Sequence, residues 1–193
     1  MILARHGESE FSARAVLNGD VRVAGGLTAA GKVQARELGE ALRDVPLGLC
    51  VVTEFQRVRE TADEALRGRE VPRLVVREFN DPRYGPYEGR PLEEYRAWAA
   101  SAPSSETPSG GESRHAIVTR YARGLRLLLA RPEETILVVA HSLPLAYVLG
   151  ARDGLDPVAR VPLVAYAKAY ELDAGELERA TELLERWVAA PTW

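Results

Sequence analysis

Two apolar runs that each end at a histidine constrain the fold of this chain more than any other feature. Residues 1–4 stop at Arg5 and His6, and residues 135–140 stop at His141. Both runs have the length and composition of buried strands. In an open α/β sheet, ligands bind beyond the carboxyl ends of such strands. A lone histidine there would more often begin a surface loop, but two of them predict a shared site at one edge of a sheet.

The rest of the pattern alternates between strand and helix, which favours an α/β fold. We expect a three-layer α/β/α sandwich with a mostly parallel central sheet and one antiparallel edge strand. Expected strands cover residues 1–4, 49–53, 71–78, 135–140 and 161–172, and expected helices cover 28–43, 54–66, 91–99, 113–131, 143–149 and 176–188. The strand at 71–78 is predicted to lie beside the first strand, and residues 9–26 to form a loop over the site. We expect one domain over residues 1–193, with residues 79–112 as a cap or lid.

Composition excludes several classes of protein. A net charge of −3 offers no basic field for nucleic acid. No apolar run approaches the roughly 20 residues that span a membrane, and no signal peptide is visible. The single cysteine, Cys50, lies in an apolar run and is predicted to be inert core. These features predict a cytoplasmic protein that binds neither nucleic acid nor membrane; monomer and homodimer both remain open.

The residues after the first apolar run resemble a known family. Residues 5–9, Arg-His-Gly-Glu-Ser, resemble the Arg-His-Gly-Glu-Ser/Thr signature of the histidine phosphatase superfamily, which includes cofactor-dependent phosphoglycerate mutases. Further family-like patterns are Leu-Thr-x-x-Gly, Arg-x-x-x-Thr-Ala, an acidic residue before a tyrosine and glycine, aromatic-Glu-Gly, and Gly-Glu-Ser before a long helix. They fall at residues 27–31, 57–62, 79–85, 87–89 and 111–113.

The resemblance brings Arg57 into the same site as Arg5 and the two histidines. Two guanidinium groups match phosphate oxygens bidentately, and a neutral imidazole among them is a nucleophile for the phosphoryl group. Its second nitrogen is expected to donate to a carbonyl, which fixes the tautomer. The resemblance implies His6 as the phosphorylated residue, with Arg5, Arg57 and His141 binding phosphate. We expect His141 to carry a proton and hold charge on the phosphoryl oxygens.

The leaving group also needs a proton donor. Asp81 stands in motif register with the acidic residue of the mutases, and Glu78 and Glu88 are the alternatives. Aspartate is one methylene shorter than the glutamate of that branch, which shortens its reach. Ser12 stands where the mutase branch has an asparagine near the phosphate, so Asn18 or Ser12 is expected to supply that contact. Glu78 is expected among the substrate-binding residues as well.

Three other kinds of site compete with this interpretation. Residues 26–33 are one residue short of a phosphate-binding P-loop, and Val33 stands where a Ser or Thr must ligate Mg²⁺. Ser142 resembles the nucleophile of a serine hydrolase, but no histidine follows it in the chain. A metal site would have to use three histidines with no close pair among them. We therefore predict no metal and no cofactor.

Within the family, the choice lies between hydrolase, mutase and degenerate binding scaffold. Mutases must exclude water from the phosphoenzyme with a longer insertion, whereas only residues 90–109 separate Gly89 from Gly110 here. This favours a metal-independent phosphatase that acts on a small phosphorylated metabolite. A scaffold would need none of Arg5, His6 and Arg57.

Overall fold

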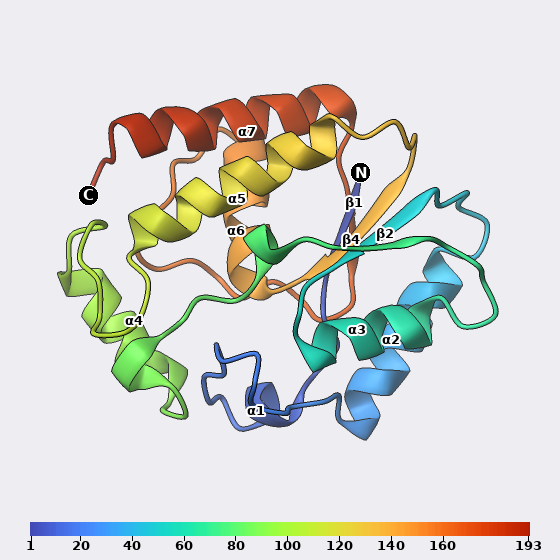
Figure 1. Cartoon of the computed structure of the whole chain (residues 1–193), viewed down its shortest axis with the longest axis horizontal. Coiled ribbons are helices and arrows are strands. Elements are labelled where there is room, and N and C mark those ends of the chain that lie inside the picture. Colours follow the sequence, from blue (N-terminus) through green and yellow to red (C-terminus); the bar gives the residue numbers. More distant parts are fainter.

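The computed structural model describes residues 1–193, and a five-stranded sheet runs through its centre (Figure 1). The strand order is β3-β2-β4-β1-β5; every neighbouring pair is parallel except β1 with β5. The strands are β1 (Ile2–Arg5), β2 (Leu49–Val52), β3 (Arg73–Val75), β4 (Ile136–Ala140) and β5 (Ala169–Glu171). The helices are α1 (Glu10–Ala13), α2 (Ala29–Ala41), α3 (Gln56–Ala65), α4 (Leu92–Ser101), α5 (Arg114–Leu129), α6 (Ser142–Arg152) and α7 (Ala174–Ala189), with short 3₁₀ turns η1 (Arg77–Phe79) and η2 (Gly85–Tyr87). The predicted α/β class, parallel sheet and antiparallel edge strand are confirmed.

Helices cover both faces of the sheet because the central strands are buried on both sides. Successive strand residues point to opposite faces, so Leu3 and Val138 join one apolar cluster while Ile2 and Val139 join the other. The first cluster lies under α5, α6 and α7, and the second lies under α2 and α3 (Figure 1). Cys50 is fully buried in the second cluster, and burial raises the pKa of its thiol to about 12, as expected for inert core.

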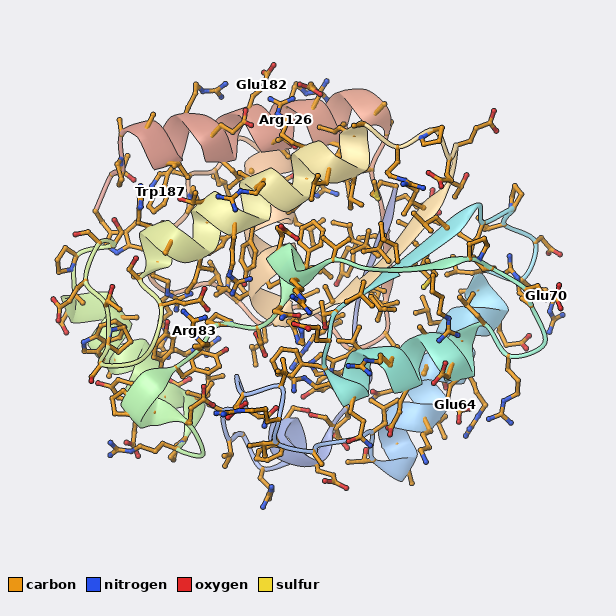
Figure 2. All side chains as sticks on the ribbon, viewed as in Figure 1. Glu64, Glu70, Arg83, Arg126, Glu182 and Trp187 are labelled. Atoms are coloured by element: carbon orange, nitrogen blue, oxygen red, sulfur yellow. The ribbon has the colours of Figure 1, made fainter.

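The helices begin at residues that can cap them. Thr28 accepts a hydrogen bond from the Gly31 amide at the start of α2, and Ser113 accepts one from the Ala116 amide at the start of α5. Such caps satisfy amides that have no partner inside the helix. The long outer helix α7 packs on α5, and Figure 2 shows Arg126 between the two helices. Arg126 forms ion pairs with Glu178 and Glu185 of α7. None of the helices combines the length and hydrophobicity that crossing a lipid bilayer requires.

Several predicted elements need correction. The third strand is only three residues long and lies at the sheet edge beside β2, because β4 and β5 occupy both edges of β1. The last strand covers only residues 169–171, since Pro162 lacks an amide hydrogen and Ala167 has a left-handed backbone (φ 45°). The predicted loop at 9–26 contains α1, which Ser9 and Ser12 close with a reciprocal capping box.

The sheet register brings the two histidines to the same edge. Arg5 at the end of β1 pairs with Ala140 at the end of β4, and the His6 amide donates to the Ala140 carbonyl. His6 and His141 therefore follow neighbouring parallel strands at the carboxyl edge. Residues of the predicted cap, among them Tyr84 and Tyr95, line a pocket over that edge.

Candidate active site

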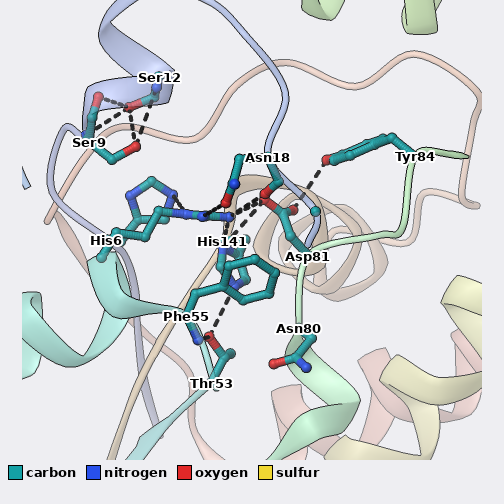
Figure 3. A network of polar contacts seen from close by, with 12 residues as sticks. His6, Ser9, Ser12, Asn18, Thr53, Phe55, Asn80, Asp81, Tyr84 and His141 are labelled. Atoms are coloured by element: carbon teal, nitrogen blue, oxygen red, sulfur yellow. Dashed lines mark hydrogen bonds and ion pairs between the residues drawn. The ribbon is translucent and has the colours of Figure 1, made fainter. Parts of the chain in front are cut away.

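The two imidazoles lie close together at this sheet edge, and His6 lines the pocket (Figure 3). Their ring centroids are 5.4 Å apart and the rings meet edge to face. His6 is 4% exposed and His141 is 0% exposed. The structure thus brings together the two residues that ended the apolar runs of the sequence.

A single guanidinium group, that of Arg57, connects the polar residues of the site. It extends from the first turn of α3 and lies over the Phe55 ring. Its Nε donates to Nε2 of His6 at 3.2 Å, and one terminal nitrogen approaches Nδ1 of His141 at 3.2 Å. The same nitrogen donates to a carboxylate oxygen of Asp81 at 2.7 Å. One guanidinium group can make all of these contacts because it has five N–H donors in one plane, and it stays protonated in a protein.

The hydrogen bonds assign a tautomer to each histidine. Nδ1 of His6 lies 2.7 Å from the Gly7 carbonyl, which can only accept, so Nδ1 carries the hydrogen and Nε2 has a lone pair. This matches the predicted carbonyl contact. Nδ1 of His141 accepts from Arg57, and its Nε2 therefore donates to the Thr53 hydroxyl at 3.0 Å.

Both imidazoles are neutral in this arrangement. Burial, followed by the charge of Arg57, lowers the pKa of His6 and of His141 well below the usual value. For His6 this is the form that a nucleophile needs. For His141 the same direction runs against the predicted protonated imidazole, because the ring is desolvated and lies beside the charge of Arg57.

Arg5 is the second buried cation of the site. Its guanidinium stacks on the Tyr166 ring with 3.8 Å between the guanidinium carbon and the ring centroid. One terminal nitrogen donates to the Val164 carbonyl at 2.8 Å, and no carboxylate pairs with it. Burial lowers the pKa of Arg5, the direction expected of a cation removed from water.

Asp81 lies on the opposite side of Arg57 from His6. One carboxylate oxygen accepts from Arg57, and the other accepts from the Tyr84 hydroxyl at 3.3 Å. The first oxygen is also 3.5 Å from Nδ1 of His141. Burial raises the pKa of Asp81 while the charge of Arg57 opposes the rise. Because burial and the charge of Arg57 shift the pKa of this carboxyl in opposite directions, a change in the nearby charge can change its protonation.

The remaining predicted residues have different positions and partners in the structure. Asn18 is buried and accepts from Arg57 through both its side-chain oxygen, at 2.8 Å, and its carbonyl, at 3.1 Å. Ser12 lines the pocket, but its hydroxyl is used in the cap of α1. Glu88 accepts from the amides of Gly19 and Tyr84, which occupies its oxygens.

Glu78 is not brought to this pocket. It belongs to η1 and borders a separate shallow surface pocket together with Glu54 and Arg77. This position differs from its predicted place among the substrate-binding residues, because the turn after β3 brings Asp81 rather than Glu78 to the pocket that His6 lines.

Sequence reasoning missed three residues that orient the site. Thr53 holds the ring of His141, Phe55 lies edge-on to that ring with centroids 4.8 Å apart, and Tyr166 stacks on Arg5. Thr53 and Phe55 directly follow β2 at the same sheet edge as His6, which was an available signal. No local pattern distinguishes Tyr166.

The competing motifs have structural explanations. The P-loop-like segment contains Thr28, which caps α2 and donates its hydroxyl hydrogen to the Glu8 carboxylate. A carboxylate of the chain itself therefore lies at the helix start where a P-loop would bind phosphate. The Ser142 hydroxyl accepts from the Val164 amide. His115, the third histidine, is half-buried on α5, and its ring contacts the Val188 carbonyl at 2.9 Å. No group of three or more His, Cys, Asp or Glu side chains is arranged to hold a metal ion.

Taken together, the site presents a neutral imidazole whose Nε2 lone pair accepts only from Arg57, two buried guanidinium groups and one carboxyl. Two cations against one carboxylate leave an excess of one positive charge, which attracts a phosphate anion. At 4 Å and an effective dielectric near 20, each such cation–anion pair is worth about 4 kcal/mol before desolvation. The arrangement suits nucleophilic transfer of a phosphoryl group.

Comparison with known proteins agrees with this chemistry. Residues 1–188 match the histidine phosphatase superfamily, branch 1. The adenosylcobalamin/alpha-ribazole phosphatase of Salmonella typhimurium is 31% identical over 148 residues, which cover 72% of each chain. The uncharacterized phosphatase PhoE of Bacillus subtilis is 30% identical over 156 residues, covering 80% of this chain and 78% of that protein. The crystal structure of the alpha-ribazole phosphatase from Shigella flexneri superimposes with a TM-score of 0.70 at 28% identity, covering 80% of this chain and 79% of that one.

The chain therefore belongs to the histidine phosphatase superfamily, branch 1. The relatives named above are phosphatases, and the chain is a histidine-phosphatase-type enzyme.

Proposed function

We propose that this protein hydrolyses phosphomonoesters of a small metabolite through a phosphohistidine formed on His6. The observation that carries the proposal is the state of the His6 ring. Its Nδ1 is held by the Gly7 carbonyl, and its Nε2 lone pair faces the donors of Arg57. Arg5, Arg57 and Asn18 line the pocket beside His6, and His141 contacts Arg57 from behind the pocket lining.

The reaction divides into two steps. In the first, Nε2 of His6 attacks phosphorus, the P–O ester bond breaks, and the leaving oxygen takes the proton of Asp81. In the second, water attacks the phosphohistidine, Asp81 accepts a proton from that water, and inorganic phosphate and His6 are released. Arg5 and Arg57 hold the phosphoryl oxygens throughout, and a positioned acid of this kind typically contributes about 10²–10⁴-fold.

Asp81 must hold a proton when substrate is bound, although Arg57 favours its ionised form. The bound phosphate dianion removes this conflict, because it takes up donors of Arg57 and adds a like charge beside the carboxylate. Both changes act in the same direction as burial, which already raises the pKa of Asp81. We therefore assign Asp81 rather than Glu88 as the acid, since two backbone amides already occupy Glu88.

The cap supports hydrolysis rather than phosphoryl transfer to a second ester. The pocket is bounded by α4 and by the loop after α6, and the cap segment between Gly89 and Gly110 is too short to carry the longer insertion of a mutase. Water reaching the phosphohistidine would complete hydrolysis. A binding scaffold would not need the neutral His6 between Arg5 and Arg57.

The proposal is tested by trapping the intermediate. With a ³²P-labelled phosphomonoester and rapid acid-free quenching, the parent chain should carry acid-labile, base-stable label. His6→Ala should lose both label and turnover. His115→Ala is the matched control and should retain them, because His115 contacts the Val188 carbonyl and does not line the pocket. Label that persists in His6→Ala would overturn the assignment.

Metal independence is a second expected outcome of the proposal. Turnover should be unchanged after dialysis against EDTA, because Arg5 and Arg57 provide the positive charge that a divalent cation would otherwise supply. The check is the rate of phosphate release before and after EDTA. A loss of rate that Mg²⁺ or Zn²⁺ restores would contradict the expectation.

A further inference from the structure

Three arginines of this chain are buried, and their partners differ. Arg5, Arg57 and Arg114 are 7%, 3% and 5% exposed. Arg57 pairs with the carboxylate of Asp81, whereas no carboxylate pairs with Arg5 or Arg114. A buried cation without a counter-ion is costly, so such a residue is informative. Both unpaired arginines line the same pocket.

The contacts of Arg114 leave most of its donors free. It extends from the first residue of α5, and its two terminal nitrogens reach the Tyr147 hydroxyl and the Ala159 carbonyl, each at 3.3 Å. Both distances are at the long end for N–H···O bonds. Its Nε is buried and has no hydrogen-bond partner. The guanidinium carbon lies 5.1 Å from the centroid of the Tyr95 ring.

Unsatisfied polar atoms gather in this pocket. Of the five buried side-chain nitrogen or oxygen atoms without a partner, three belong to the pocket-lining residues Arg5, Tyr95 and Arg114. Buried polar groups are normally hydrogen-bonded, so each exception calls for a partner. For Arg5 the phosphoryl group is that partner under the proposed function. The same reasoning asks for an anion at Arg114.

Arg114 lies away from the phosphoryl end of the pocket. The Tyr84 hydroxyl contacts Asp81, the Tyr84 ring packs on the Tyr95 ring with centroids 4.8 Å apart, and Arg114 follows beyond Tyr95. Apolar side chains line the pocket as well, among them Leu92, Leu143 and Val161. A molecule reaching from Arg5 to Arg114 would therefore place an apolar body between two polar ends.

We propose that the substrate carries a second anionic group, a carboxylate or a phosphate, which Arg114 binds at the end of an apolar body remote from the scissile phosphate. This inference rests on the proposed function and specifies its substrate class. Arg114 is then a specificity-determining residue: it pairs with the ligand instead of with a carboxylate of the chain.

The test compares esters that differ only in the charge of the far end. A series of ω-carboxyalkyl phosphates of increasing length is assayed beside the corresponding methyl esters, with α,ω-alkane bisphosphates to distinguish a second phosphate from a carboxylate. In the parent chain, kcat/KM at the best-fitting length should be at least about 10-fold higher for the charged member, mostly through KM. Since this comparison needs no variant, it does not depend on how a substitution affects folding.

Variants then assign the preference to one residue. Arg114→Met should lose the preference for the charged member while hydrolysing the neutral methyl esters within about threefold of the parent rate. Arg123→Met is the matched control, since Arg123 lies on the same helix with an exposed side chain, and it should retain the preference. Arg114→Lys should retain part of it.

The outcomes separate the two proposals. Equal kcat/KM for charged and neutral esters at every length would overturn this inference and leave the proposed function standing. An equal fall for both kinds of ester in Arg114→Met would do the same, because it would make Arg114 a structural residue. Absence of His6-dependent turnover with every ester would overturn the proposed function and this inference with it.

Discussion

At the scale of single residues, one guanidinium group determines the state of the whole site. Arg57 contacts both histidines, Asn18 and Asp81, so it orients the nucleophile and the acid together. Its charge also helps to keep the two imidazoles neutral. A residue that contacts so many partners should be sensitive to any substitution.

Arg57→Ala should weaken the binding of inorganic phosphate or vanadate by about 1.5–3 kcal/mol, the range for a hydrogen bond to a charged group. Competitive inhibition of ester hydrolysis measures the change, or calorimetry where turnover is lost. Arg59→Ala is the control on the same helix, because Arg59 is exposed and contacts only the Glu54 carbonyl. An unchanged dissociation constant for Arg57→Ala would place the anion elsewhere.

Asp81→Asn separates acid catalysis from binding. With p-nitrophenyl phosphate, whose leaving group hardly needs a proton, kcat should fall little. With an alkyl phosphate, kcat should fall by about 10²-fold or more. The two rates are measured on the same preparation, so loss of folded protein cancels. Equal losses on both substrates would remove Asp81 from the role of acid and direct attention to Glu88.

At the scale of elements, the position of His6 depends on how closely the loop after β1 approaches α2. A Cβ at Gly7 would lie 2.4 Å from the Gly31 carbonyl oxygen, and one at Gly31 would lie 2.0 Å from the Glu8 carbonyl oxygen. Two glycines thus let the backbone carrying His6 lie directly against the first turn of the helix. No other residue fits at either position without moving that backbone.

Gly31→Ala is expected to destabilise the fold by about 1–3 kcal/mol through overpacking. It should also lower kcat by about 10²-fold, because an ångström-scale displacement of a catalytic group has effects of that size. Urea unfolding and steady-state kinetics measure the two changes. Ala30→Ser, at an exposed position of the same helix, is the control. Unchanged kcat in Gly31→Ala would show that the loop relaxes without moving His6.

At the scale of the whole molecule, two apolar clusters on opposite faces of the sheet exclude water from its central strands. One lies under α5, α6 and α7 and the other under α2 and α3. Between them, at the sheet edge, His6 and His141 are buried in their neutral forms. This burial links the stability of the fold to pH.

The free energy of unfolding should fall as the pH drops below about 6.5. The unfolded chain protonates both histidines near that pH, whereas the folded chain, in which the pKa of each is well below its usual value, does not. The unfolded state then binds up to two more protons, and stability falls by up to about 2.7 kcal/mol per pH unit. The raised pKa of Asp81 acts in the opposite direction and reduces the slope at lower pH.

Urea unfolding at pH 7.0, 6.5, 6.0 and 5.5, without phosphate in the buffer, measures this slope. His141→Gln should reduce it to about half, since an amide can still contact Thr53 but does not titrate in this range. A free energy of unfolding that stays constant over these four pH values would contradict the neutral, buried state of both histidines.

The amino-acid sequence by itself determined the features that depend only on residues close together in the chain. Apolar runs identified β1, β2 and β4, and the caps at Thr28 and Ser113 set the starts of two helices. A strand followed by a histidine indicated the sheet edge at which His6 and His141 meet. These features are readable because strand burial and helix capping are decided within a few residues of chain.

Only the tertiary structure decided which strands and side chains meet. The edge position of β3, the shortness of β5 and the separation of Glu78 from the pocket follow from pairing with distant parts of the chain. The neutral state of His141 required its burial against Arg57 and Thr53. Burial and charge at a site depend on everything packed around it, so no local pattern of residues contains them. For the same reason, only the folded chain identifies Arg114 as a buried cation that has no carboxylate partner.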